Sequence, residues 1–188
     1  MESNNKNSEK MNKESNKWAS SPKDIILMSI FTLSFIVQII LLFVYNNELS
    51  MKLLEYVGYG LWVVSIIFGI APIIILKRKG KAPKGKSYIH TQKIVTDGLY
   101  ALVRHPQYLA GIFFSLSISF ITQSWISFIL TGLIILLTYQ WTYQEDKELI
   151  KRFGDKYSQY KQKVPRLNIL LGIAYYLLRG RKNQKKTQ

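Results

Sequence analysis

Three long stretches of the sequence contain no Asp, Glu, Lys or Arg, and they constrain the fold more than any other feature. They cover residues 25–44, 57–76 and 109–143. A helix needs about 20 apolar residues to cross the hydrocarbon core of a bilayer, so the first two stretches allow one crossing each and the third allows two. The sequence therefore predicts an all-α polytopic membrane protein.

The distribution of basic residues predicts how these helices are oriented. If the third stretch folds back at Gln123 and Ser124, the chain has four spans, at about residues 25–44, 57–76, 108–121 and 126–143. Every Lys and Arg except Lys52 then lies on one side. Because basic residues are retained on the cytoplasmic side, both termini are expected in the cytoplasm. Three spans would separate the basic tail from the basic 77–107 loop.

Composition divides the rest of the chain. Residues 1–19 are rich in Asn, Lys and Ser and predict a disordered cytoplasmic arm. Residues 20–180 are expected to form the membrane domain, with cytoplasmic helices after the last span, and residues 181–188 a basic tail. The apolar stretch 169–178 is too short to cross, and an interfacial or a re-entrant helix both fit it.

The net charge of +15 raises the question of a polyanionic partner. The basic residues that produce this charge lie next to the expected spans, which favours anionic lipid over nucleic acid as the partner. The chain has no cysteine and two histidines without ligand spacing, so no metal site is predicted. The sequence does not indicate an oligomeric state.

One short polar run stands directly before the third apolar stretch. It contains Arg104 and His105, followed by Pro106, which suits the first turn of a helix. Glu145 and Asp146 follow the end of the same stretch. A helical hairpin returns its end beside its start, so we expect the cationic pair and the acidic pair to share one cavity at the membrane face. Charged groups near lipid usually line such a cavity.

These residues belong to a compound pattern that resembles a known family. Its first part is formed by Gly98, Tyr100, Arg104, His105, Pro106, Tyr108 and Gly111, and its second by Glu145, Asp146, Leu149, Phe153, Gly154, Tyr157 and Tyr160. The pattern is similar to that of the integral-membrane methyltransferases, namely isoprenylcysteine carboxyl methyltransferase and the related phospholipid methyltransferases. It covers roughly residues 93–167. Two departures are visible: Asp146 replaces the second Glu of the usual pair, and Asn168 stands where a proline is usual.

The resemblance implies a cytoplasm-facing site for S-adenosylmethionine and a lipophilic acceptor that enters from the membrane. Glu145 suits the ribose hydroxyls, while Arg104 and His105 suit the α-carboxylate of the cofactor. An apolar slot around Val95 and Leu99 suits the adenine. The full set expected to bind the cofactor is Val95, Leu99, Tyr100, Arg104, His105, Pro106, Tyr108, Glu145 and Asp146.

The acceptor decides which further residues act. A prenylcysteine carboxylate is already a nucleophile, and Arg166 is expected to orient it, with Arg166 and Glu145 as the catalytic candidates. A phospholipid amine would need a base, for which Glu145, Asp146 and His105 are candidates. The sequence leaves this choice open.

Two other functions fit part of the sequence. A membrane reductase would share the lipid-facing acceptor but use NADPH, and the loop has no Arg cluster dedicated to a 2′-phosphate. A non-enzymatic scaffold that binds anionic lipid would explain the charge and the spans, but not the placement of Arg104, His105, Glu145 and Asp146. Methyl transfer accounts for all of these features.

Overall fold

The structure is a computed structural model that describes residues 21–44, 51–81 and 91–184. Within these ranges every regular element is helical. In chain order the elements are α2 (Pro22–Val44), α3 (Lys52–Lys79), the 3₁₀ turn η1 (Gly98–Ala101), α4 (Pro106–Thr122), α5 (Trp125–Phe153), α6 (Asp155–Lys163) and α7 (Ile169–Gln184). The arm predicted at residues 1–19 and the last four residues of the predicted tail lie outside the described residues.

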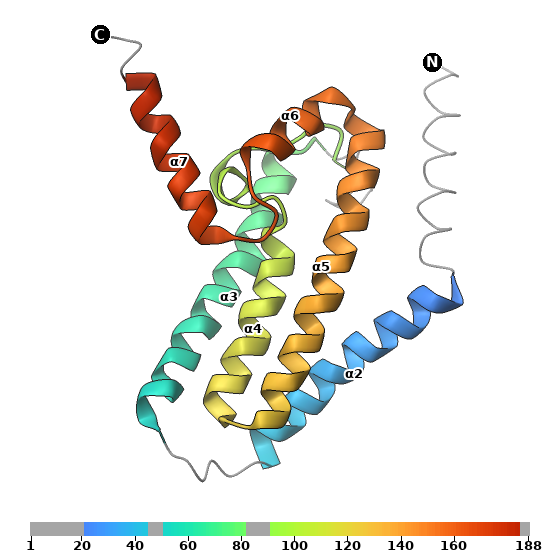
Figure 1. Ribbon diagram of the computed structural model, residues 1–188, viewed down its shortest axis with the longest axis vertical. Helices are drawn as coiled ribbons and strands as arrows, with labels where there is room; N and C mark the ends of the chain where they lie inside the picture. The colour runs from blue at the N-terminus through green and yellow to red at the C-terminus, as the bar shows by residue number, and fades with distance from the viewer. Residues whose placement is uncertain (1–20, 45–50, 82–90, 185–188) are drawn as a thin grey trace.

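Helices α2, α3, α4 and α5 form an up-and-down bundle (Figure 1). Helix α4 packs along α3 on one side and α5 on the other, and the far end of α2 crosses both α4 and α5. The predicted fold-back between α4 and α5 is confirmed, because only Gln123 and Ser124 separate them. Gln123 has φ of +51°. Its side-chain amide donates to the carbonyl of Met51 at 3.0 Å and accepts from the amide of Met51 at 3.3 Å, which joins the hairpin to the start of α3.

Helices α3 and α4 approach each other closely. A Cβ atom on Gly58 would lie 2.7 Å from Cγ1 of Ile121 and 3.0 Å from the carbonyl oxygen of Ser117. Two turns further along α3, the hydroxyl of Ser65 donates to the carbonyl of Ala110 at 2.9 Å. Small residues allow such contact between apolar helices, so this helix pair is the tightest part of the bundle.

Helix α2 is attached to the bundle by a buried polar cluster. The amide of Gln38 donates to Oγ1 of Thr131 and to the carbonyl of Ser127, both at 2.9 Å, and its oxygen accepts from Ser115 at 2.9 Å. Gln38 is completely buried. Since an unpaired amide would be costly among apolar side chains, these bonds fix where α2 lies against α4 and α5.

The outward faces of the bundle are apolar. Leu33 on α2, Leu53 on α3 and Leu136 on α5 are each at least 59% exposed. Helices α2, α3 and α5 are long and apolar enough to cross a membrane, while α4 is apolar but has 17 residues. The prediction of a polytopic helical architecture is thus supported for three spans, and the described residues do not establish the fourth.

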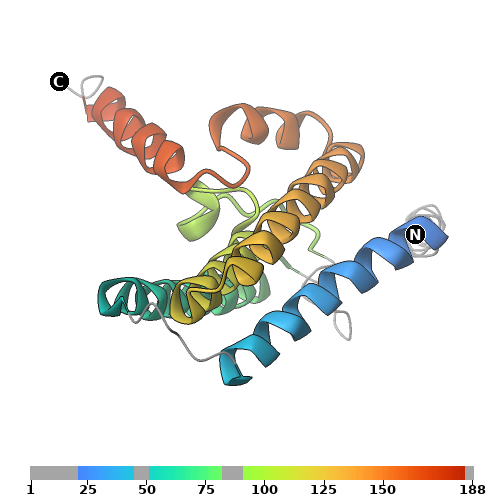
Figure 2. The same ribbon diagram turned by 60° about the horizontal axis from the view of Figure 1, so that its bottom comes forward.

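Helix α5 continues well beyond the predicted span at 126–143. It runs without interruption to Phe153, so Glu145 and Asp146 lie inside the helix and beyond the predicted membrane span. Gly154 has φ of +60°, a conformation that favours glycine, and α6 begins at the next residue. Helices α6 and α7 lie at the end of the bundle where α4 begins, and α7 points away from the other helices (Figure 2).

Candidate functional site

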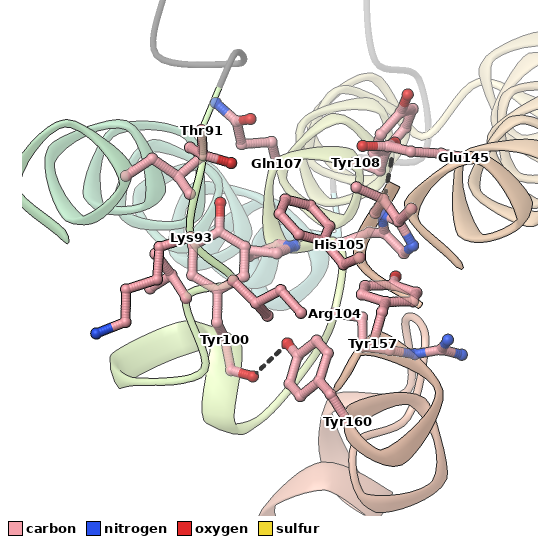
Figure 3. A pocket seen from close by; sticks show the side chains of 16 residues that line it. Thr91, Lys93, Tyr100, Arg104, His105, Gln107, Tyr108, Glu145, Tyr157 and Tyr160 are labelled. Atoms are coloured by element: carbon pink, nitrogen blue, oxygen red, sulfur yellow. Dashed lines mark hydrogen bonds and ion pairs between the residues drawn. The ribbon is translucent and has the colours of Figure 1, made fainter. Parts of the chain in front are cut away.

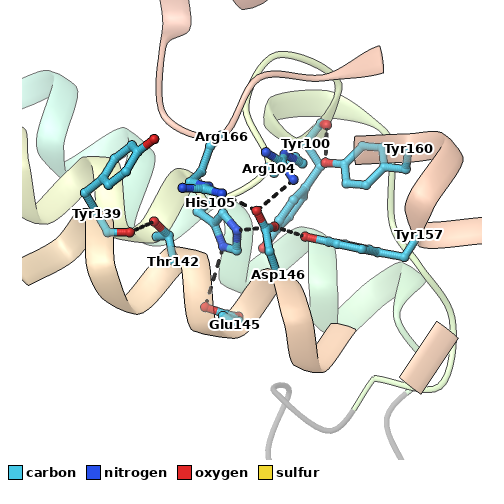
Figure 4. Close-up of polar contacts among 10 residues, drawn as sticks. All are labelled: Tyr100, Arg104, His105, Tyr139, Thr142, Glu145, Asp146, Tyr157, Tyr160 and Arg166. Carbon is cyan, nitrogen blue, oxygen red and sulfur yellow. Dashed lines mark hydrogen bonds and ion pairs between the residues drawn. The ribbon is translucent and has the colours of Figure 1, made fainter. Parts of the chain in front are cut away.

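Asp146 is the centre of the polar site. Its carboxylate is fully buried and accepts hydrogen bonds from four side chains (Figure 4). Nη1 of Arg104 lies 2.9 Å from Oδ2, and Nε2 of His105 lies 3.0 Å from Oδ1. The hydroxyl of Tyr157 is 2.6 Å from Oδ1, and Nε of Arg166 is 3.0 Å from Oδ2. One carboxylate therefore holds together the start of α4, the end of α5, helix α6 and the segment before α7.

His105 lies between the two acidic residues. Its Nε2 faces Asp146, and its Nδ1 lies 3.5 Å from Oε2 of Glu145. Burial by itself would lower the pKa of His105, but the hydrogen bonds and charges of Asp146 and Glu145 outweigh burial and raise its pKa above the ordinary value. The raised pKa favours an imidazolium that donates from both ring nitrogens.

Backbone bonds fix the start of α4. The amide of Arg104 donates to the carbonyl of Pro165 at 3.0 Å, and the amide of His105 donates to the carbonyl of Arg166 at 3.3 Å. Pro106 occupies the first turn of α4, as the sequence predicts. The segment that carries Arg166 and the loop that carries Arg104 are therefore paired through both backbone and side chains.

A pocket opens next to this network, between the 91–108 segment, the end of α5 and helix α6 (Figure 3). Apolar side chains and polar groups both line it. The lining residues are Leu76, Thr91, Lys93, Ile94, Val95, Tyr100, Arg104, His105, Pro106, Gln107, Tyr108, Glu145, Leu149, Phe153, Tyr157 and Tyr160. Such a lining suits a ligand with one flat apolar part and one charged part.

Side-chain contacts hold the 91–97 segment over the pocket. Nζ of Lys79 at the end of α3 lies 2.8 Å from Oδ2 of Asp97, in an exposed ion pair. The guanidinium of Arg152 on α5 donates to the carbonyl of Thr91. This segment contributes Thr91, Lys93, Ile94 and Val95 to the pocket wall, so α3 and α5 together define its outer rim.

Seven of the predicted site residues line the pocket and three do not. Those in the wall are Val95, Tyr100, Arg104, His105, Pro106, Tyr108 and Glu145. Leu99 instead packs against the hydrophobic cluster around Val103. Asp146 lies behind the wall and supports it. The predicted adjacency of the cationic and acidic pairs is confirmed, and the roles of these residues in binding remain predictions.

Arg166 lies beside the pocket, against the side of α5. Its guanidinium carbon is 4.9 Å from the ring centre of Tyr139 and 5.2 Å from that of Tyr143. Both tyrosines are exposed. Asp146 lies between Arg166 and the pocket. Its carboxylate therefore binds Arg104 on the pocket side and Arg166 on the opposite side.

Two tyrosines of α6 contribute to the site without having been assigned a role from the sequence. Tyr157 donates to Asp146, and the hydroxyl of Tyr160 donates to the carbonyl of Tyr100 at 2.6 Å. Burial, followed by the bond to Asp146, raises the pKa of Tyr157 far above its ordinary value, and burial likewise raises the pKa of Tyr160. Both hydroxyls therefore remain donors at neutral pH. Their three-residue spacing on a helix was the signal that places them on one face.

Nε of Arg104, in the pocket wall, is buried and donates no hydrogen bond within the part of the chain that the structure describes. Oε2 of Glu145 is buried as well, and it lies 3.5 Å from Nδ1 of His105 in an ion pair. Buried polar atoms are normally paired, so the wall fits a ligand that brings an acceptor to Arg104 and hydroxyl donors to Glu145. A nucleoside with an amino-acid tail has both groups.

The fold and this site define a class of protein: a helical membrane protein with a pocket of mixed polar and apolar lining at one end of its bundle. Residues 40–156 match the phospholipid methyltransferase family, and the chain belongs to that family. The predicted resemblance to membrane methyltransferases is thereby confirmed.

Individual relatives carry a related name. Over 73 residues the chain is 37% identical to a protein-S-isoprenylcysteine O-methyltransferase of Schizosaccharomyces pombe. This alignment covers 38% of this chain and 31% of that protein. It is 36% identical over 86 residues to the Mus musculus protein of that name, covering 43% of this chain and 28% of the relative. Protein-S-isoprenylcysteine O-methyltransferase B of Arabidopsis thaliana is 27% identical over 141 residues, covering 64% of this chain and 71% of the relative. The chain thus matches about a third of the length of the first two.

Proposed function

We propose that the protein transfers a methyl group from S-adenosylmethionine to a lipophilic acceptor, most directly the carboxylate of a prenylcysteine. The observation that carries this proposal is the contact of Arg104 and His105 with Glu145 and Asp146 in a chain of the phospholipid methyltransferase family. Family membership also favours methyl transfer over an NADPH-dependent reductase and over a lipid-binding scaffold.

The pocket residues suit the parts of this cofactor. Glu145 would accept from the ribose hydroxyls, and Nε of Arg104 would donate to the carboxylate of the amino-acid tail, with the positive charge of His105 beside it. Val95, with the neighbouring backbone, would cover the adenine. The cofactor supplies an electrophilic methyl group on its sulfonium. Glu145, which lies in the pocket wall, would also add negative charge beside a bound cation.

Other wall residues would act by position. Tyr100, Pro106 and Tyr108 would exclude water and restrict the orientation of the bound nucleoside. Leu99 would act through its backbone and the packing of η1, because its side chain faces the hydrophobic cluster. Asp146 would act as a positioning residue for Arg104, His105 and Arg166.

On the acceptor side, Arg166 would orient a prenylcysteine carboxylate. Its position between Asp146 and two exposed tyrosines of α5 supports this role, since an apolar chain can lie against Tyr139 and Tyr143 while its carboxylate meets the guanidinium. A carboxylate is ionised at neutral pH, so no general base is needed. The names of the relatives point to the same acceptor class for those proteins.

A phospholipid amine is the second candidate acceptor, because the family as a whole is described as phospholipid methyltransferases. An amine must lose a proton. Both oxygens of Asp146 already accept bonds, and His105 lies between two carboxylates, so Glu145 would be the base.

We propose that α4 is the fourth span and that α2, α3 and α5 are the other three. The antiparallel packing of α4 between α3 and α5 supports this arrangement. Both termini, α6 and α7 would then lie in the cytoplasm with almost all basic residues, where the basic loop contacts anionic lipid.

The acceptor can be identified with cofactor labelled in its methyl group. Purified protein in vesicles would be incubated separately with an S-farnesylcysteine derivative and with phosphatidylethanolamine. We expect label on the farnesylcysteine that alkaline hydrolysis releases as methanol, because an ester is base-labile and an N-methyl group is not. Label only on the amine lipid would favour the second acceptor, and label on neither would contradict the proposed activity.

A further inference from the structure

Two cationic side chains contact the same aromatic ring on α5. Nζ of Lys147 lies 4.4 Å from the ring centre of Tyr143, and the guanidinium carbon of Arg166 lies 5.2 Å from it. Lys147 follows Tyr143 by one helical turn, whereas Arg166 comes from the segment between α6 and α7. Aromatic rings attract cations through their quadrupole. Tyr143 therefore brings together two positive charges from separate parts of the chain.

Both cations can be reached from outside the bundle. Lys147 is exposed, Tyr143 is 47% exposed, and the side chain of Arg166 is 14% exposed. Arg166 donates to Asp146 through Nε, so the edge of its guanidinium that carries the two Nη groups lies farther from that carboxylate. This edge of Arg166 and the ammonium group of Lys147 thus offer hydrogen-bond donors to an external anion.

The ring of Tyr143 lies at the expected membrane boundary of α5. Tyr143 is the last residue of the third charge-free stretch, and Lys147 is the next residue on the same side of the helix. Tyr139 and Leu136 continue this side toward the expected lipid, and they are 59% and 70% exposed. A molecule with a charged end and an apolar chain therefore fits this side of α5, with its charged end at Lys147 and Arg166.

The chemistry of this surface favours an anionic phospholipid. A phosphate diester is negatively charged at neutral pH and accepts hydrogen bonds through several oxygens, so it suits an ammonium and a guanidinium together. Its acyl chains suit the exposed apolar side chains of α5. A free phosphate ion would make the polar contacts and leave the apolar ones unused.

We propose that Lys147, Arg166 and Tyr143 form a binding site for the phosphate of one anionic phospholipid in the leaflet nearest the pocket, with its acyl chains along Tyr139 and Leu136. The contacts that carry this site do not depend on the proposed methyl transfer. Arg166 is also the proposed contact of the acceptor carboxylate, so an entering acceptor would displace the lipid headgroup from Arg166.

Lipid binding can be measured without cofactor or acceptor. Purified protein in neutral detergent micelles would be titrated with phosphatidylglycerol, and the rise in unfolding temperature gives the apparent affinity. We expect Lys147→Gln to weaken this affinity about fivefold, as for the loss of one Lys at an anionic headgroup. Lys151→Gln is the matched control, because it removes the same charge from an exposed position one turn further from the membrane. We expect it to keep the affinity of the unaltered protein.

Tyr143 variants test whether the ring holds the two cations at the site. Tyr143→Phe keeps an aromatic ring and should bind phosphatidylglycerol like the unaltered protein. Tyr143→Leu removes the ring and should weaken binding as Lys147→Gln does. A Tyr143→Leu protein with unaltered affinity would exclude the ring from the site.

Four results would overturn the proposal as a whole. The first is that phosphatidylglycerol does not stabilise the unaltered protein. The second is that Lys147→Gln weakens binding no more than Lys151→Gln, which would mean diffuse attraction to surface charge. The third is equal stabilisation by phosphatidylcholine, which would remove the need for an anionic headgroup. The fourth is equal stabilisation by inorganic phosphate, which would make the ligand a free anion.

Discussion

At the scale of single residues, Asp146 should control the stability of the site. Asp146→Asn would leave Arg104 and Arg166 without their ion-pair partner in a buried place. Breaking a buried pair by removing one partner costs about 3–5 kcal/mol, so we expect a loss of that order in the free energy of unfolding. Denaturant unfolding in detergent micelles would measure it.

Tyr157→Phe is the matched control for this change. It removes one hydrogen bond to the same carboxylate but leaves both arginines paired, so we expect a smaller loss of about 1.5–3 kcal/mol. If the two variants are equally stable, Asp146 is not the centre of the network.

His105 gives the site a pH dependence. Its pKa is raised in the folded protein, so its stabilising contribution is complete below the unfolded pKa of about 6.5 and is lost as the pH rises through the higher folded pKa. His105→Gln should therefore destabilise the protein more at pH 6 than at pH 9. The difference in unfolding temperature between the two proteins at each pH measures this. An equal difference at both values, or a larger one at pH 9, would show that the imidazolium is not the stabilising form.

The sequence predicted the members of the site better than their arrangement. Arg104 and Glu145 stand at the two ends of a helical hairpin. These ends lie close together however the two helices are rotated, so the sequence could predict that the two residues are neighbours. The side of α5 that faces the pocket depends on helix rotation, so the sequence did not separate Glu145, in the wall, from Asp146, behind it. Tyr157 depends on the turn at Gly154, whose direction follows from tertiary packing.

At the scale of helices, the α3–α4 contact should be sensitive to added volume. Gly58→Ala would place a methyl group against Ile121 and a backbone carbonyl, and we expect it to destabilise the protein by about 1–3 kcal/mol. Gly60→Ala on the same helix is the control, because nothing lies within 4 Å of its added Cβ. Comparing the unfolding of both variants would separate packing from helix propensity. A Gly58→Ala protein as stable as Gly60→Ala would mean that the two helices are not in close contact.

The charge-free stretches predicted where the spans lie, but not how far each helix extends past its span. All four predicted spans fall inside helices, and α3 and α5 extend further past their predicted spans than α2 and α4 do. Polar residues continue a helix readily once it has left the lipid, so the loss of apolar pattern after residue 143 marks the membrane boundary rather than the end of α5. Gly154 ends it instead, because its φ is positive.

At the scale of the whole molecule, the distribution of basic residues predicts a topology that single cysteines can report. Lys52→Cys should react with a membrane-impermeant thiol reagent from outside intact cells, and Lys156→Cys should react only after permeabilisation. The reason is that Lys52 is the one basic residue on its side of the expected arrangement. Labelling of both positions from the same side would rule out the proposed orientation.

The central claim is that the pocket beside Asp146 binds the methyl donor, and thermal unfolding with S-adenosylhomocysteine tests it most directly. A ligand that binds only the folded state stabilises it by about 2.7 kcal/mol at 100 times its dissociation constant. We predict a higher unfolding temperature with S-adenosylhomocysteine, no change with NADPH, and a much smaller increase in Glu145→Ala, compared with that variant's own unfolding without ligand. No stabilisation of the unaltered protein, or full stabilisation of Glu145→Ala, would contradict the account.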